Sequence, residues 1–143
     1  KLIIMTITNF SNEYNWLSNF YPCVIEYESI KYSSVEHAFV AAKTNSLDIR
    51  QLISRIPKPG LVKRIGKHLV LRDDWEQVKL NIMRELLLKK FQIPELKELL
   101  LSTGNTALVE GNTWGDTFWG VCNGEGSNYL GKLLMGIRIE IAT

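Results

Sequence analysis

Glu36, His37 and Lys43 are residues whose types and spacing could carry out chemistry. They stand in the stretch Ser33–Lys43, SSVEHAFVAAK. Glu36 and Lys43 are seven residues apart, close to two helical turns, so in a helix both lie on one side, roughly 10 Å apart. His37 points elsewhere and is more typical of a hydrogen-bonded structural histidine. The stretch therefore predicts a helix with a polar stripe that holds a carboxylate and an ammonium.

Two hypotheses explain Glu36. Ser33 and Glu36 have the S-x-x-E spacing of a capping box, in which the serine caps the helix and the glutamate reaches back to the serine amide. Alternatively, Glu36 is a catalytic carboxylate that stabilises developing positive charge or activates water. The spacing alone leaves both hypotheses open.

A second candidate region is rich in glycine. Six of the ten glycines lie in the segment from Glu110 to Gly131. This density favours either backbone amides that approach a phosphate ahead of a helix, or a set of tight surface turns. Trp119 and two further aromatic residues, Trp114 and Phe118, are interleaved with these glycines and can stack on flat rings. Asp116 lies among them.

Several classes of site are excluded by their missing motifs. The chain has no third glycine for a dinucleotide fingerprint, no phosphate-binding GxxxxGK[ST] loop and no GxSxG nucleophile motif. Cys23 and Cys122 lack the spacing of a zinc site, and we interpret both as reduced thiols of a cytoplasmic protein, with a disulfide between them left open. No apolar run is long enough to span a bilayer, and the first ten residues do not resemble a signal peptide. We therefore expect no metal, no cofactor and no membrane association.

Charge is unevenly distributed along the chain. The net charge is only +2, but residues 55–97 contain 11 basic and 5 acidic side chains. Such a segment can meet phosphates on a small ligand or on nucleic acid. The alternative is that these lysines and arginines only solvate helix surfaces.

Helices and strands must position these residues. Their pattern in the sequence predicts one α+β domain over residues 1–143, mostly helical, with a small antiparallel sheet. We expect Asp73 and Glu76 to begin the longest helix, and Asn128 to cap the last one. The predicted strands are 3–10, a hairpin of 23–29 and 30–34 that turns at Glu28–Ser29, and 106–111. The predicted helices are 33–43, 46–56, 60–67, 73–91, 93–103 and 127–142.

Seven blocks of sequence together resemble the NADAR, or YbiA-like, family. They are WLSNFYPCVIEYESIKYSSVEHAFVAAK, KRIGK, LRDDWEQVKLNIMRELLLKKF, LLSTG, LVEG, DTFWG and GEGSNYLGKLLMGIR, in this order, from about Asn9 to Arg138. The resemblance implies a compact, mostly helical domain. The family was proposed to bind NAD and ADP-ribose derivatives, and its characterised members are N-glycosidases. Some cleave phosphoribosylamino intermediates of riboflavin biosynthesis, and others remove ADP-ribose from guanine bases.

The resemblance also implies roles for individual residues. The glutamate of the VEH motif, Glu36, becomes the expected catalytic carboxylate, with Asp116 orienting water or a ribose hydroxyl. The expected substrate-binding residues are Asn19, Phe20, Lys43, Arg64, Lys67, Trp75, Trp119, Gly120, Gly126 and Asn128. Among them Lys43, Arg64, Lys67 and the backbone of 124–128 are expected to hold phosphate, and Trp119 and Trp75 to stack on a base or sugar. One departure is Gly66-Lys67, where the family usually has Gly-Arg, and lysine cannot reproduce an arginine's bidentate phosphate contact.

The sequence thus predicts an N-glycosidase that cleaves the bond between a phosphorylated ribose and a base or amine. The substrate is either a ribosylated small molecule, such as a riboflavin intermediate, or ADP-ribosylated guanine in nucleic acid. Two alternatives are a non-catalytic ADP-ribose or NAD-binding module, and a nucleic-acid-binding protein that uses the basic segment. No obligate protein partner is implied.

Overall fold

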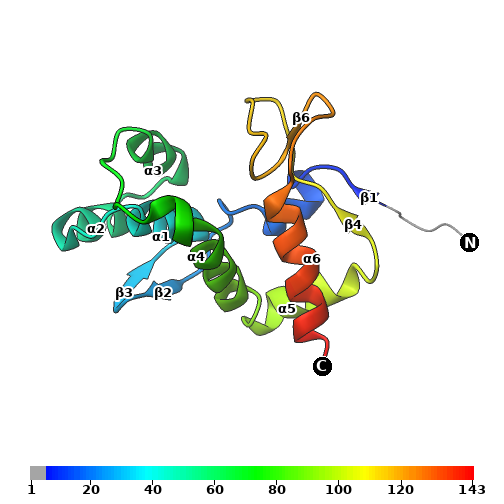
Figure 1. Cartoon of the computed structure of the whole chain (residues 1–143). Coiled ribbons are helices and arrows are strands. Elements are labelled where there is room, and N and C mark those ends of the chain that lie inside the picture. Colours follow the sequence, from blue (N-terminus) through cyan, green and yellow to red (C-terminus); the bar gives the residue numbers. More distant parts are fainter. Residues whose placement is uncertain (1–5) are drawn as a thin grey trace, which may run out of the picture. The chain divides into compact units, whose positions relative to one another are not determined.

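The structure is a computed structural model that describes residues 6–143. The chain forms two units, each described here by itself: a central unit of residues 19–90, and a terminal unit of residues 6–18 and 91–143. Helices predominate in both units and the strands are short (Figure 1). The α+β fold class predicted from the sequence is therefore confirmed.

The central unit begins with the predicted hairpin. Strands β2 (Ile25–Tyr27) and β3 (Ile30–Tyr32) pair antiparallel, with Ile25 opposite Tyr32. Glu28 and Ser29 form the turn with φ angles of 45° and 72°. Two consecutive positive φ angles are typical of a type I′ turn, whose twist matches that of paired strands. The predicted hairpin and its turn are confirmed.

Four helices complete the central unit, and α1 lies at its centre. They are α1 (Val35–Ala42), α2 (Leu47–Ser54), α3 (Pro59–Gly66) and α4 (Trp75–Lys90). Helix α1 contacts each of the other three, and seven of its eight residues are buried. Proline at the first position of α3 suits a helix start because its missing N–H has no helical partner there. Helix α4 begins at Trp75, directly after Asp74. The predicted cap at Asp73 would have placed the start of the helix one residue earlier.

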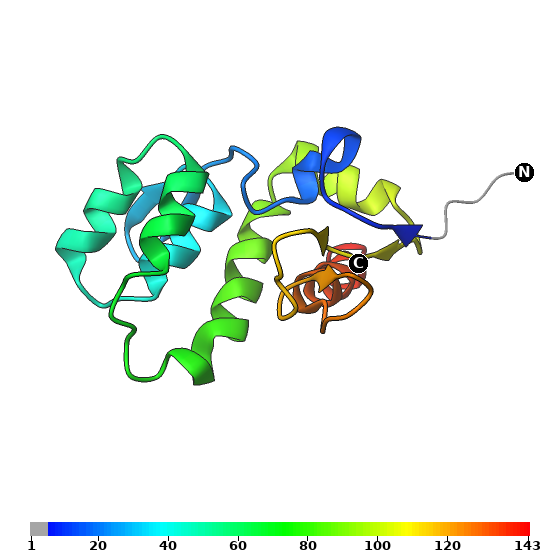
Figure 2. The ribbon, with the colours of Figure 1, turned by 90° about the horizontal axis from the view of Figure 1, so that it is seen from above.

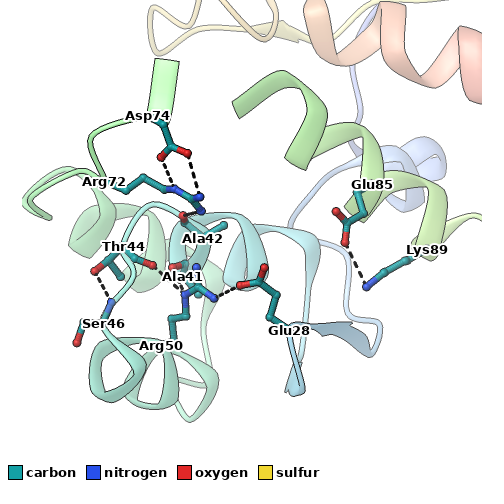
Figure 3. A network of polar contacts seen from close by, with 10 residues as sticks. All are labelled: Glu28, Ala41, Ala42, Thr44, Ser46, Arg50, Arg72, Asp74, Glu85 and Lys89. Carbon is teal, nitrogen blue, oxygen red and sulfur yellow. Dashed lines mark hydrogen bonds and ion pairs between the residues drawn. The ribbon is translucent and has the colours of Figure 1, made fainter. Parts of the chain in front are cut away.

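A buried arginine ties the hairpin to the end of α1. The Arg50 Nε group donates to the carbonyls of Ala41 (3.2 Å) and Thr44 (2.8 Å). Its Nη1 pairs with Glu28 at the hairpin turn, as Figure 3 shows. The Ala41 carbonyl lies in the last turn of α1 and also accepts from the Thr44 N–H (3.3 Å), and the Thr44 carbonyl lies just past the end of the helix. Arg50 therefore satisfies the C-terminal end of α1 from within the core.

The terminal unit contains α5 (Pro94–Ser102), α6 (Tyr129–Ile141) and the 3₁₀ turns of η1 (Asn12–Leu17). Its strands are paired in parallel: β1 (Thr6–Ile7) with β4 (Ala107–Leu108), and β5 (Gly111–Asn112) with β6 (Val121–Cys122). The strand predicted over 3–10 is thus seen only as β1, and its residues 3–5 lie outside the described part. The prediction of an antiparallel sheet holds for β2–β3 alone.

Candidate functional site

Glu36 is the one residue of α1 that its surroundings leave partly exposed. It lies in the first turn, and its backbone N–H donates to the carbonyl of Asn19 (3.0 Å). The other seven residues of the helix are packed into the core of the central unit, which leaves the helix no freedom to rotate. A carboxylate on a fixed, buried helix is held as catalysis requires.

The capping-box hypothesis for Glu36 assigned the cap of the helix to the wrong serine. Ser34, not Ser33, caps α1, and its hydroxyl accepts a hydrogen bond from the His37 N–H (3.1 Å). The same hydroxyl meets the His37 Nδ1 (2.6 Å), while the His37 Nε2 lies 2.7 Å from the Ile56 carbonyl. Because a carbonyl can only accept, Nε2 carries the proton. His37 is 1% exposed, so its predicted structural role fits these contacts.

Lys43 lies at the other end of α1, half-buried. Its Nζ is 5.9 Å from the centre of the Phe39 ring. Burial lowers the pKa of Lys43, the charge of Glu36 opposes that shift, and Lys79 adds to it. The carboxylate and the ammonium predicted to share one side of the helix thus interact electrostatically. This interaction agrees with the two-turn spacing of Glu36 and Lys43.

Helix α3 approaches this pair through a glycine. A Cβ atom added to Gly66 would lie 3.1 Å from Val40 and 3.5 Å from the Lys43 Nζ. A larger residue would press α3 away from α1. Lys67 follows at the C-cap of α3 and is exposed, and Arg64 is exposed one turn earlier. Both cations therefore stand on the helix that packs beside Lys43.

The connector from α3 to α4 is fixed to the end of α1. The Arg72 N–H donates to the carbonyl of Lys43 (2.8 Å), and its guanidinium pairs with Asp74 and reaches the carbonyl of Ala42 (Figure 3). The side-chain hydrogen bond to Asp74 raises the pKa of Arg72 further above its ordinary value. The short connector thus anchors the backbone directly after Lys43.

Asn19, Phe20 and Trp75 surround the beginning and middle of α1. Asn19 donates from its amide to the Met83 sulfur (3.6 Å), and its buried Oδ1 has no partner within the described residues. Phe20 is 39% exposed. Trp75 is 5% exposed and packs on Phe39, with 5.0 Å between the ring centres. The predicted stacking role of Trp75 is therefore corrected: its ring belongs to the core.

In the terminal unit, Asp116 holds the backbone that carries Trp119. The Asp116 Oδ1 accepts hydrogen bonds from the N–H groups of Phe118 (3.1 Å) and Trp119 (2.9 Å). Asn112, which the sequence reasoning missed, closes the loop: its Oδ1 accepts from the Asp116 N–H and its amide donates to the Asp116 carbonyl. The Asn-x-x-x-Asp spacing was the available signal. These bonds give Asp116 a positioning role.

The glycine-rich segment crosses over itself above the N-terminal end of α6, as Figures 1 and 2 show. Cβ atoms added at Gly120 and Gly126 would collide with the carbonyls of Glu110 and Gly120, respectively. Glycine is needed there because two backbones lie in contact. This is a different reason from the predicted approach to a phosphate.

Several amides of this segment already donate hydrogen bonds within the protein. The N–H groups of Ser127 and Asn128 donate to the carbonyls of Thr117 and Gly120, and those of Tyr129 and Leu130, at the start of α6, to Phe118 and Trp119. A hydrogen-bonded N–H has no proton left to offer an anion. The predicted phosphate cradle at 124–128 is therefore wrong for the amides of Ser127 and Asn128. Gly120 and Gly126 stay predicted substrate-binding residues.

Asn128 also differs from its prediction. It precedes α6 with φ 53°, and its side chain makes no cap bond. Instead it donates to the Leu108 carbonyl (3.0 Å) and accepts from the Glu110 N–H (3.0 Å). Asn128 therefore joins β4 to the start of α6.

The predicted site residues thus fall into two sets. Asn19, Glu36 and Lys43 lie around α1 in the central unit, with Arg64 and Lys67 on the neighbouring helix. Asp116, Trp119, Gly120, Gly126 and Asn128 lie in the terminal unit. Within residues 6–143, no group of three histidine, cysteine or acidic side chains could hold a metal ion. No helix in this range is long and apolar enough to cross a membrane.

Comparisons with known proteins show which family and fold the chain resembles. Residues 7–142 match the NADAR domain family. The N-glycosidase YbiA of Shigella boydii is 40% identical over 144 residues, which cover 96% of this chain and 89% of YbiA. A riboflavin biosynthesis protein of Vibrio vulnificus is 33% identical over 90% of this chain and 36% of its own length. The solution structure of Escherichia coli YbiA, 37% identical, superposes with a TM-score of 0.84 over 98% of this chain and 85% of that one.

The chain belongs to the NADAR family. The match includes both units, and the predicted fold resemblance is confirmed by the solved structure.

Proposed function

We propose that this NADAR-family hydrolase cleaves the N-glycosyl bond between a phosphorylated ribose and a nitrogenous base or amine. The observation that carries the proposal is Glu36, a partly exposed carboxylate on an otherwise buried helix, coupled to Lys43. Relatives named as N-glycosidases support the reaction class.

Glu36 supplies the chemistry. Breaking the C1′–N bond leaves its electron pair on the base nitrogen and develops oxocarbenium character on the sugar. A carboxylate beside C1′ stabilises this positive charge, as carboxylates do in O-glycosidases. It also accepts a proton from the water that attacks C1′, and the base nitrogen gains a proton as it leaves.

Neighbouring groups of the central unit bind the rest of the substrate. Lys43, Arg64 and Lys67 are cations suited to phosphate oxygens. The buried Oδ1 of Asn19 lacks a protein partner within the described residues, and a ribose hydroxyl can donate to it. The Asn19 carbonyl also accepts a hydrogen bond from the Glu36 N–H, so a ribose bound to the Asn19 side chain would be fixed in position relative to α1.

In the terminal unit, we assign Trp119 to stacking on a flat ring and Asp116 to holding the Trp119 backbone. Trp114, which is 61% exposed, is a further candidate platform. Base stacking on an aromatic ring contributes about 1–3 kcal/mol per base. Since Cys23 and Cys122 are both free thiols, we also propose the cytoplasm as the working compartment.

The experiment offers two substrates separately: DNA carrying ADP-ribosylated guanine, and the phosphoribosylaminopyrimidine intermediate of riboflavin biosynthesis. Release of the ribosyl product is followed by mass spectrometry, beside a Glu36→Gln control. Release from one substrate, abolished in the control, identifies that substrate. Tight binding of ADP-ribose without release from either would favour the non-catalytic binding module instead.

A further inference from the structure

A stretch of the central unit contains cations without compensating acids. Residues 49–72 contain seven lysines and arginines and no aspartate or glutamate. Two of the seven are neutralised by partners outside the stretch, Arg50 by Glu28 and Arg72 by Asp74. The excess of positive charge therefore resides on the end of α2, the α2–α3 loop and α3.

Four of these cations are exposed: Arg55, Lys58, Arg64 and Lys67. None of the four forms an ion pair with a carboxylate in the described part of the chain. We call these four residues the α2–α3 basic surface. Uncompensated surface cations create a positive potential that attracts polyanions.

The α2–α3 basic surface surrounds a hollow. A cavity of about 480 Å³ is lined by Pro57, Lys58, Gly60, Leu61 and Arg64. Two of the four cations thus line the same cavity, Lys58 at the N-cap of α3 and Arg64 in its last turn. Arg55 precedes the cavity at the C-cap of α2, and Lys67 follows it at the C-cap of α3.

The shape of this surface decides between two polyanions. A lipid bilayer is broad and flat, so its headgroups would meet the rim of the hollow but leave Lys58 and Arg64 within it poorly used. A nucleic-acid strand is narrow and carries successive phosphates, so it can enter a concave surface and follow cations spread over two helix ends and a loop.

We propose that the α2–α3 basic surface binds the phosphodiester backbone of a nucleic-acid strand. Binding requires no ribosylated base and no catalysis, so it stands apart from the proposed N-glycosidase activity. Arg64 and Lys67 are also candidates for substrate phosphate, whereas Arg55 and Lys58 are not, and these two therefore carry the test.

The experiment measures fluorescence anisotropy of a labelled, unmodified single-stranded DNA of 20 nucleotides over a series of salt concentrations. Four phosphate contacts predict a slope of log K against log salt of about −2.8, since each contact contributes about −0.7 on single strands. The double variant Arg55→Gln/Lys58→Gln should lower the affinity and flatten the slope to about −1.4. Lys31→Gln/Lys132→Gln, which removes two exposed cations elsewhere, should keep the wild-type slope.

Three outcomes would overturn the proposal. One is a wild-type slope near zero, which needs no variant to interpret. Another is an equal loss in both double variants, which would mean attraction by net charge alone. The third is binding to phosphatidylserine vesicles but not to DNA, which would make the surface a membrane contact. The Glu36→Gln variant should bind the DNA as the wild type does, so a failure of the proposed catalysis would leave this result intact.

Discussion

The carboxylate of Asp116 holds the backbone of its own loop. Its Oδ1 accepts from two consecutive N–H groups, and its own backbone is closed in a ring with Asn112. What these bonds need at position 116 is an oxygen acceptor, not a negative charge. Asparagine supplies the same oxygen in a neutral side chain.

Asp116→Asn and Asp116→Ala should therefore differ in their effects on kinetics and stability. We expect Asp116→Asn to keep kcat within a few-fold, and Asp116→Ala to raise KM, because Trp119 loses the anchor of its backbone. Loss of the two bonds is expected to cost about 1–3 kcal/mol of stability in the alanine variant. Steady-state kinetics and thermal unfolding of both variants measure this. An inactive, folded Asp116→Asn would mean that the charge itself takes part in the reaction.

For single residues, the sequence could predict that Glu36 and Lys43 lie on one side of a helix, because the spacing of two residues along a helix determines the directions of their side chains. It could not predict that Ser34 caps α1 or that Trp75 is covered by Phe39. Those facts depend on where the chain turns into the helix and on which helices pack together. Asn112 could not be predicted because its partners are backbone groups, which every residue type carries.

Helix α6 contains two glycines with opposite surroundings. A Cβ atom at Gly131 would collide with the Leu108 carbonyl and the Asn128 side chain, whereas a Cβ atom at Gly136 would meet nothing within 4 Å. Gly131 thus lets α6 approach β4, and Gly136 only weakens the helix. Both glycines are accommodated without a break, since α6 is continuous from Tyr129 to Ile141.

Alanine at the two positions should change stability in opposite directions. Gly136→Ala should stabilise the protein by about 0.5–1 kcal/mol, the ordinary gain in a helix interior. Gly131→Ala should destabilise it by about 1–3 kcal/mol, as overpacking does. Chemical denaturation gives both values. Equal effects of one sign would mean that α6 and β4 are not in contact as described.

Local pattern could predict helices of 8 to 16 residues, and the hairpin through its two-residue turn. The parallel pairs β1–β4 and β5–β6 could not be predicted. Each joins strands of two residues, too short for the alternation that marks a longer strand, and β1 and β4 also lie far apart in sequence. The high density of glycines in 111–131 is visible in the sequence, but the reason why glycine is needed there, a crossing of backbones, is visible only in three dimensions.

At the level of the whole chain, Lys90 links folding to pH. It is fully buried, and burial lowers its pKa from the ordinary 10.5 to about 7, while nearby Cys23 opposes the shift. Above pH 7 the unfolded chain keeps the Lys90 proton that the folded chain has lost. The unfolding free energy should therefore rise with pH from about 7 upward.

Lys90→Met should remove this rise. Between pH 7 and about 8.5, one proton contributes up to about 1.4 kcal/mol per pH unit. This window stays below the titration of Cys23, whose thiol pKa burial raises. Urea unfolding at several pH values tests the prediction, with Lys89→Met, an exposed neighbour, as the control. A slope unchanged in Lys90→Met would mean that Lys90 is charged in the folded protein.

Family membership spans both units, and the single domain expected over 1–143 stays a prediction, as do the roles of the individual site residues. Among those roles, that of the Glu36 carboxylate is central to the proposed N-glycosidase reaction. Its partial exposure, its fixed helix and its coupling to Lys43 are all features of the central unit.

The most direct test is the single-turnover rate of Glu36→Gln on whichever riboside the wild type cleaves, at saturating enzyme. Loss of a general acid–base group predicts a rate about 10²–10⁴-fold lower, equivalent to about 3–5 kcal/mol of transition-state stabilisation. The melting temperature should stay near that of the wild type, since the side chain contributes little to the core. A folded Glu36→Gln that cleaves at the wild-type rate would contradict the account.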